Sequence, residues 1–315
     1  MAKTKNTQAK VPIQLEPGTS AYEIQKEVRE LLSLTSIQEW EKELAVRGSR
    51  HTKYYHYTTL GVLKEIMASG HWRLNRLDAG NDPFEEKVHG TSFTTSSLSS
   101  MGMWYWYSKM REKNDIGVRI GIPKKTFRKI FPDKALLYRK DGNAFEPLDK
   151  ADAGQAVLKT TDVAYWHFGK EEDGSNDMLF YKTYAFTFKA LGLYDGLRKK
   201  TSASFKRPKE NELPPSFKRA VWRTEAETRV YCDFGDEHDK VPRDVYVEIP
   251  QDAFGKMDFW LDPRFSFDSC MNRFDNAGKA MELLMFFGNK LLREKCIKMK
   301  QFSFSDSPEV FLEDK

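Results

Sequence analysis

Near the N-terminus, apolar residues recur at intervals of three and four, as on one face of a helix. Ser36 and Glu39 have the capping-box spacing, in which a hydroxyl and a carboxylate satisfy free backbone N–H groups where a helix begins. We therefore expect a helical appendage over residues 18–49. Before it, residues 1–17 are polar and lysine-rich, and we expect them to form a disordered basic tail.

From residue 50 onward the pattern changes to short strands with interspersed helices. Tyr54–Tyr57 is typical of an aromatic strand, and Thr59 then precedes a helical apolar pattern that ends at Gly70. Alternation predicts a strand at Val118–Ile122. Further predictions are strands at 72–74, 92–95, 136–139, 157–161, 163–168, 184–188, 224–232, 245–249 and 296–302, helices at 104–110 and 276–292, and a basic loop at 198–219. This pattern indicates the α+β class, with a main domain over residues 50–305 and a tail over 306–315.

Composition fits an ordinary globular chain, apart from an excess of aromatic residues. The 315 residues include 22 Phe, 13 Tyr and 7 Trp, and 40% are apolar, which excludes disordered and fibrous classes. Lys and Arg number 51 against 46 Asp and Glu, a formal charge of +5 that is weak support for binding a polyanion.

Several features of the sequence indicate where in the cell the protein is located. The three cysteines lie far apart, so neither a disulfide framework nor a zinc ribbon is expected. No apolar run approaches the roughly 20 residues of a membrane span, and the N-terminus lacks a secretory signal. We expect a cytoplasmic protein with no membrane partner.

Common catalytic motifs are not present in the sequence. It contains no phosphate-binding loop, dinucleotide fingerprint, H-E-x-x-H or G-x-S-x-G pattern. The six histidines show no paired ligand spacing, so we expect no metal site. Three local groups of residues remain as candidates.

The first group is His56-Tyr57-Thr58, between the aromatic strand and the helix that Thr59 caps. A histidine at this position can donate to a ligand hydroxyl, and the alternative is a buried structural histidine.

The second group joins a turn to an aromatic run. Asn81 and Asp82 precede Pro83, which favours a tight turn that continues to Glu85. Residues 103–107 then place Met, Trp, Tyr, Trp and Tyr in a row. Such a run either packs into the core or forms a stacking wall for a flat ring.

The third group is Trp222–Arg229, of sequence W-R-T-E-A-E-T-R. In a strand, the period of two places Glu225, Glu227 and Arg229 on one face. Two such carboxylates repel one another, and Arg229 can keep one of them ionised. The alternative is a solvated, charged edge strand.

Together the three groups resemble a bacterial family, a domain of unknown function. Its marks are a tyrosine-rich start, the NDPFE turn, a later M-W-x-x-Y and a W-x-x-E-x-E-x-R strand, which correspond here to Tyr55–Thr59, Asn81–Glu85, Met103–Tyr107 and Trp222–Arg229. The resemblance covers roughly residues 50–305. That family in turn resembles a divergent branch of the ADP-ribosyltransferase superfamily, which implies a split antiparallel sheet.

The resemblance implies specific roles. His56 takes the superfamily's first position and Glu227 its third, with Glu225 as the first member of E-x-E. One of Trp104, Tyr105 and Tyr107 takes the second position. NAD is the implied co-substrate, with no metal, and the implied NAD-binding residues are His56, Tyr57, Thr58, Asn81, Trp104, Tyr105, Tyr107 and Arg229.

The expected function is therefore NAD-dependent ADP-ribosyl transfer to a macromolecule, in a bacterial toxin–antitoxin or phage-defence system with a possible neutralising antitoxin protein. The basic loop slightly favours nucleic acid over protein as the acceptor, through Lys199, Lys200, Lys206 and Arg207. One alternative is a magnesium-dependent nuclease that uses Asp82, Glu85, Glu225 and Glu227. Another is a non-catalytic nucleic-acid-binding module.

Overall fold

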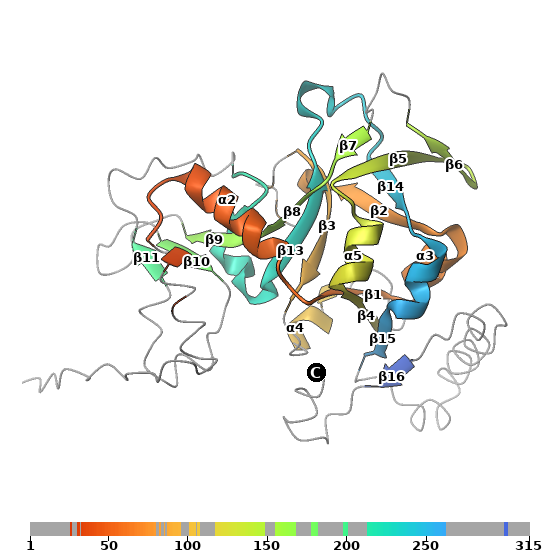
Figure 1. Ribbon diagram of the computed structural model, residues 1–315, viewed down its shortest axis with the longest axis horizontal. Coiled ribbons are helices and arrows are strands. Elements are labelled where there is room, and N and C mark those ends of the chain that lie inside the picture. The colour runs from red at the N-terminus through yellow and green to blue at the C-terminus, as the bar shows by residue number, and fades with distance from the viewer. Residues whose placement is uncertain are drawn as a thin grey trace, which may run out of the picture.

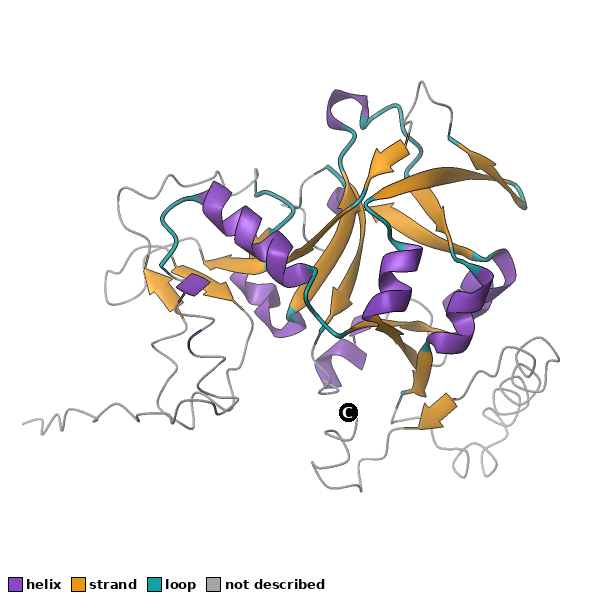
Figure 2. Cartoon of the chain, viewed as in Figure 1, coloured by secondary structure: helices purple, strands orange, loops and turns teal. Residues whose placement is uncertain are grey.

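In the part of the chain that the computed structural model describes, strands dominate and helices are few (Figures 1 and 2). The structure describes residues 26, 30–31, 33–79, 82, 85, 87–95, 101–104, 106–107, 117–148, 155–167, 178–181, 198–200, 213–262 and 299–301. The strands in this part of the chain pair mostly in antiparallel fashion, which confirms the α+β class.

Two sheets contain the described strands. The larger has twelve: β1 (Lys53–Thr59), β2 (His71–Arg76), β3 (His89–Thr94), β4 (Gly117–Pro123), β5 (Lys134–Asp141), β6 (Ala144–Pro147), β7 (Gln155–Val157), β8 (Lys159–Asp162), β13 (Glu227–Cys232), β14 (Asp244–Glu248), β15 (Asp258–Leu261) and β16 (Met299–Gln301). The smaller has four: β9 (Ala164–His167), β10 (Met178–Tyr181), β11 (Arg198–Lys200) and β12 (Phe217–Arg219).

The larger sheet forks at β3. Its order is β16-β15-β4-β1-β3-β2-β14-β5-β6, and β13 pairs with β3 and β8 while β7 pairs with β5. Near its end β3 pairs with β1, Tyr55 opposite Thr94, whereas near its start it pairs with β2, Arg76 opposite His89. β13 pairs with β3 along the whole length of β3. β1 and β2 pair with opposite ends of β3 and therefore diverge from one another there.

The two faces of the β4-β1-β3-β13 region carry different residues. On one face, Tyr54, Phe93 and Ile120 belong to the main apolar core. The helices α3 (Leu60–Ser69) and α5 (Lys124–Ile130) contribute Leu63 and Phe127 to that core. By alternation, the opposite face carries Tyr55, Tyr57, Arg119, Ser92, Thr94, Glu227 and Arg229.

The predicted caps are confirmed. Ser36 and Glu39 form a capping box at the start of α2 (Ile37–Gly48). Thr59 accepts a hydrogen bond from the Val62 N–H at the start of α3, and Gly70 ends that helix in the left-handed conformation, with a φ of 68°. Within the described residues, no helix is long and apolar enough to cross a membrane.

The appendage helix α2 packs on β8 and beside the smaller sheet (Figure 1). Trp40 is fully buried, and its ring centroid lies 6.4 Å from that of Phe217. A Cβ atom on Gly48 would lie 2.7 Å from the backbone nitrogen of Asp162, so only glycine allows this approach. Residue 162 also fixes the helix end, because the Asp162 carboxylate binds His51 at 2.8 Å.

Three predicted elements differ from the structure. The strand predicted at 157–161 is two strands, because β7 and β8 pair with different partners. The predicted loop at 198–219 contains β11 and β12. The strand predicted at 224–232 begins only at Glu227. The residues before it, Ala220–Glu225, form a 3-10 helix (η4). Ala226, at a φ of 44°, turns the chain between this helix and β13.

Several predictions fall outside the described residues. These are the tails at 1–17 and 306–315, the strand at 184–188 and the helix at 276–292.

Two buried histidines, His89 and His238, adjoin the start of β3. Their ring centroids lie 5.1 Å apart, and His89 donates from Nε2 to the carbonyl of Pro242 at 2.8 Å. Burial is the main cause that lowers the pKa of both imidazoles below 6.5. The folded protein therefore holds both rings neutral over a pH range in which the unfolded chain binds protons.

We predict that Gly48→Ala destabilises the protein by about 1–3 kcal/mol, because the new methyl group meets rigid backbone. Urea unfolding measures the change. Val46→Ala, at a 39% exposed position on the same helix, is the control and should change stability little. Equal stability of the two variants would show that α2 does not pack closely on β8.

We predict that stability decreases in acid through His89 and His238. Since their folded pKa values lie below the unfolded value of 6.5, the free energy of unfolding is intact above that pH and falls as the pH drops through it. Urea midpoints at about pH 7.5 and about pH 5.5 test this. His238→Leu should make the loss of stability between these two pH values smaller. His167→Gln, at an exposed position, should leave that loss unchanged. The same slope in all three proteins would contradict the prediction.

Candidate active site

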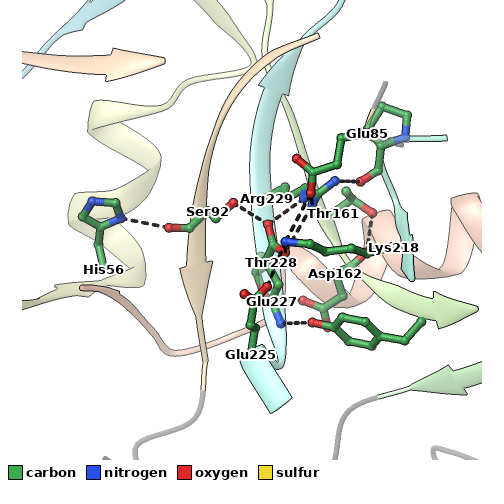
Figure 3. Close-up of polar contacts among 12 residues, drawn as sticks. His56, Glu85, Ser92, Thr161, Asp162, Lys218, Glu225, Glu227, Thr228 and Arg229 are labelled. Atoms are coloured by element: carbon green, nitrogen blue, oxygen red, sulfur yellow. Dashed lines mark hydrogen bonds and ion pairs between the residues drawn. The ribbon is translucent and has the colours of Figure 1, made fainter. Parts of the chain in front are cut away.

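A cluster of buried charged side chains lies between the smaller sheet and the face of the larger sheet that is opposite the apolar core (Figure 3). Glu227 is 3% exposed and lies at the start of β13. Its Oε1 accepts a short hydrogen bond from the Ser92 hydroxyl and one of 2.6 Å from Nε of Arg229. Its Oε2 accepts from Lys218 at 3.3 Å and from Nη2 of Arg229 at 3.2 Å. All four donor contacts converge on one carboxylate.

Glu225 lies beside Glu227 but accepts fewer hydrogen bonds. It ends η4 and is 7% exposed. One oxygen accepts a short hydrogen bond from the Tyr107 hydroxyl, and the other accepts from Lys218 at 2.9 Å. Glu225 therefore keeps acceptor capacity that Glu227 has already used.

Glu85 completes the cluster. Glu85 contacts Nη2 of Arg229 at 2.5 Å and Lys218 at 3.2 Å. Three carboxylates and two cations leave a formal charge of −1 when every group is ionised. Because these charges are desolvated, each depends on its partners being in place.

The two glutamates have opposite pKa shifts. For Glu225, burial is the largest influence and raises the pKa above 4.5, against the opposing effect of Lys218. Burial also opposes ionisation of Glu227, but Arg229 and Lys218 outweigh it, so the pKa of Glu227 lies well below 4.5. Glu227 is therefore held as the anion, and Glu225 is the more readily protonated of the two carboxylates.

Aromatic side chains lie next to the two glutamates. Burial, followed by the charge of Glu225, raises the pKa of Tyr107 far above 10, so its hydroxyl stays a donor. Tyr107 packs against a buried cluster of Tyr55, Tyr57, Trp104 and Trp260. Within it, the rings of Tyr57 and Trp104 meet edge to face at 4.8 Å. The aromatic run at 103–107 thus contributes both to packing and to the surroundings of Glu225.

The structure separates His56 from the glutamates. His56 lies on the core face of β1, where its ring centroid is 5.0 Å from that of Trp72. Its Nδ1 is 2.9 Å from the carbonyl oxygen of Ser92, while the Ser92 hydroxyl points to Glu227 on the other side of β3 (Figure 3). Thr58 is buried and shares the core face of β1 with the partly buried His56. Neither residue contacts Glu225 or Glu227 in the described part of the chain.

The NDPFE turn and the E-x-E-x-R segment contact one another. Asp82 forms an ion pair of 3.0 Å with Arg219, and Glu85 pairs with Arg229. Glu85 therefore supplies an anion to the buried Arg229 of the E-x-E-x-R segment. Asn81 in the same turn lies outside the described residues.

Other predicted binding residues cannot be placed at the cluster. Tyr105, Lys206 and Arg207 lie outside the described residues. Lys199 and Lys200 are in β11, the edge strand of the smaller sheet in the described part of the chain, and only their backbone is described.

Three residues of the cluster were not predicted from the sequence. Lys218 lies in the stretch predicted as a basic loop, and Ser92 lies in an ordinary strand. Tyr165 belongs to no motif, and its hydroxyl accepts a hydrogen bond from the Glu227 N–H at 2.8 Å. For Ser92 a weak signal exists, since Ser92 and Thr94 alternate with Phe93 on a predicted strand. Nothing in the sequence distinguishes Lys218 from neighbouring basic residues.

Comparisons of the chain with protein-family models, curated proteins and solved structures find no match. Among the described residues, no three or more His, Cys, Asp or Glu side chains are grouped to hold a metal ion.

We predict that Glu227→Gln destabilises the protein by about 3–5 kcal/mol, because it leaves Arg229 and Lys218 buried with one fewer anion. Urea unfolding measures the loss. Glu146→Gln is the control, because Glu146 forms a half-exposed pair with Arg139 whose removal should change stability little. A Glu227→Gln protein as stable as the control would show that the cluster is solvated.

Proposed function

We propose that this protein is an NAD-dependent ADP-ribosyltransferase with Glu225 and Glu227 at its active site. The observation that carries the proposal is the pair of buried glutamates with opposite pKa shifts, which share Lys218 and adjoin Tyr107. The forked antiparallel sheet supports an ADP-ribosyltransferase-like split-sheet fold for the main domain.

The two glutamates suit the two needs of this reaction. In ADP-ribosyl transfer the bond between C1′ of the ribose and the nicotinamide nitrogen breaks, and its electron pair leaves with nicotinamide. Positive charge develops on the sugar, and the anionic Glu227 stabilises it through space. The acceptor atom forms the new bond to C1′, and its proton passes to Glu225, which has free acceptor capacity.

The surroundings of the pair also fit NAD. Tyr107, which is partly buried and contacts Glu225 through its hydroxyl, offers aromatic surface for a flat ring. His56 contacts the carbonyl of Ser92 on the core face of β1, and the hydroxyl of Ser92 contacts Glu227 on the other face. A role of His56 and Thr58 in binding NAD therefore requires part of the ligand to lie on the core face of β1.

The nuclease alternative fits the cluster less well. Lys218 and Arg229 already contact the oxygens of Glu85, Glu225 and Glu227, where a magnesium ion would need them. Asp82, the fourth carboxylate of the proposed magnesium site, forms an ion pair with Arg219. The positive charge that a nuclease takes from a metal is supplied here by side chains.

The acceptor we propose is a macromolecule, with nucleic acid favoured over protein. The support is compositional: β11 consists of Arg198, Lys199 and Lys200, and basic residues continue after it in the sequence. A role as a cytoplasmic toxin or phage-defence effector, with a neutralising antitoxin, follows from the same proposal.

We predict transfer of labelled ADP-ribose from NAD to one fraction of a bacterial lysate, with RNA, DNA and protein analysed separately by mass spectrometry. Glu225→Gln should lower transfer by about 10²–10³-fold, as loss of a group used in the transition state does. Glu227→Gln, checked for folding by circular dichroism, should do the same. Glu146→Gln is the control with unchanged transfer.

Other outcomes separate the alternatives. No ADP-ribose on any fraction, or full transfer by the folded Glu227→Gln protein, would contradict the proposal. Cleavage of nucleic acid that a chelator abolishes would indicate the nuclease. Salt-sensitive binding of nucleic acid that survives Glu227→Gln, without consumption of NAD, would indicate a binding module.

A further inference from the structure

Lys218 is a buried lysine held among three carboxylates. Its side chain is 10% exposed, and its ammonium contacts Glu225 at 2.9 Å, Glu85 at 3.2 Å and Glu227 at 3.3 Å. It also lies 5.1 Å from the ring centroid of Trp222. Removing an ammonium from water costs several kcal/mol, so its place between two candidate catalytic groups calls for an explanation beyond charge balance.

The ammonium comes from a different sheet than the glutamates. Lys218 pairs with Tyr165 in the parallel β9–β12 ladder, and the neighbouring Phe217 packs near Trp166 at 6.0 Å and Trp40 at 6.4 Å. The smaller sheet therefore sets the position of the lysine, whereas Glu227 lies on β13 of the larger sheet.

The two glutamates depend on Lys218 unequally. Glu227 has a second cation, since Arg229 contacts both of its oxygens. Glu225 has no cation other than Lys218 in contact with it within the described part of the chain. Removal of the ammonium would leave Glu227 paired and Glu225 without a counter-ion.

We propose that Lys218 is a positioning residue that orients Glu225 and keeps it ionised for the acceptor, so that it controls transfer to the acceptor more than cleavage of NAD. This inference rests on the proposed function. The titratable groups that face Lys218 are Glu85, Glu225 and Glu227, and Arg229, Tyr107 and Tyr165 surround them.

The test centres on a double variant that keeps the formal charge of the cluster. Lys218→Met alone leaves three carboxylates with one cation and can prevent folding. The double variant Lys218→Met with Glu85→Gln keeps the formal charge of −1, since one cation and one anion are removed together. Glu85→Gln alone and Lys240→Met, at an exposed position, are the matched controls. Lys218→Arg is the conservative variant.

We expect the double variant to lose about 10–100-fold in kcat for transfer, with a KM for NAD within about twofold of wild type and a smaller loss of NAD hydrolysis. The acid limb of its transfer pH profile should move to higher pH, because Glu225 without its counter-ion holds a proton longer. Lys218→Arg, which keeps the positive charge, should retain most of the wild-type transfer activity. Equal loss of transfer and hydrolysis with an unchanged pH profile would overturn the inference.

A second measurement does not depend on activity. The ¹³C signal of the Glu225 carboxyl, assigned by its disappearance in Glu225→Gln, is titrated in wild type and in the double variant. The inference requires a higher midpoint in the double variant than in Glu85→Gln alone, and an unchanged midpoint would overturn it. A wild type that neither cleaves NAD nor transfers ADP-ribose would end the proposed function, and this titration would still decide the role of Lys218.

Discussion

The ion pairs of Lys218 and Arg229 with Glu227 are the constraint on which the described structure around the site depends. At this burial an unpaired charge costs several kcal/mol, so each partner has to arrive with its own element. Arg229 comes from β13, Lys218 from β12 and Glu85 from the NDPFE turn. Satisfying these charges therefore joins the turn, the larger sheet and the smaller sheet at one place.

The same constraint explains why the two faces of β3 differ. The core face is aromatic and apolar, and His56 there contacts the backbone carbonyl of Ser92. The opposite face collects the charges, with the Ser92 hydroxyl on Glu227. An ionised Glu227 and a more readily protonated Glu225 follow from this placement, because one has two cations in contact and the other has one.

Local signals in the sequence were sufficient for the elements that they cap or alternate. The Thr59 cap, the Gly70 end and the strand at Val118–Ile122 depend on neighbouring residues only, and all three are confirmed. The E-x-E-x-R segment was wrongly predicted as a continuous strand because Ala226 adopts a rare positive φ that long-range contacts stabilise. Lys218 could not be found for a related reason: its role arises from parallel pairing of β12 with β9, to which no sequence motif points.

The central claim is that NAD reacts on the charged face of the sheet, beside Glu225 and Glu227. A crystal structure of the Glu225→Gln protein with NAD tests it most directly. The account predicts the nicotinamide-side ribose next to Glu227, with the nicotinamide ring against the aromatic cluster that includes Tyr107. NAD bound away from Glu227, with its nicotinamide-side ribose on the core face beside His56, would contradict it.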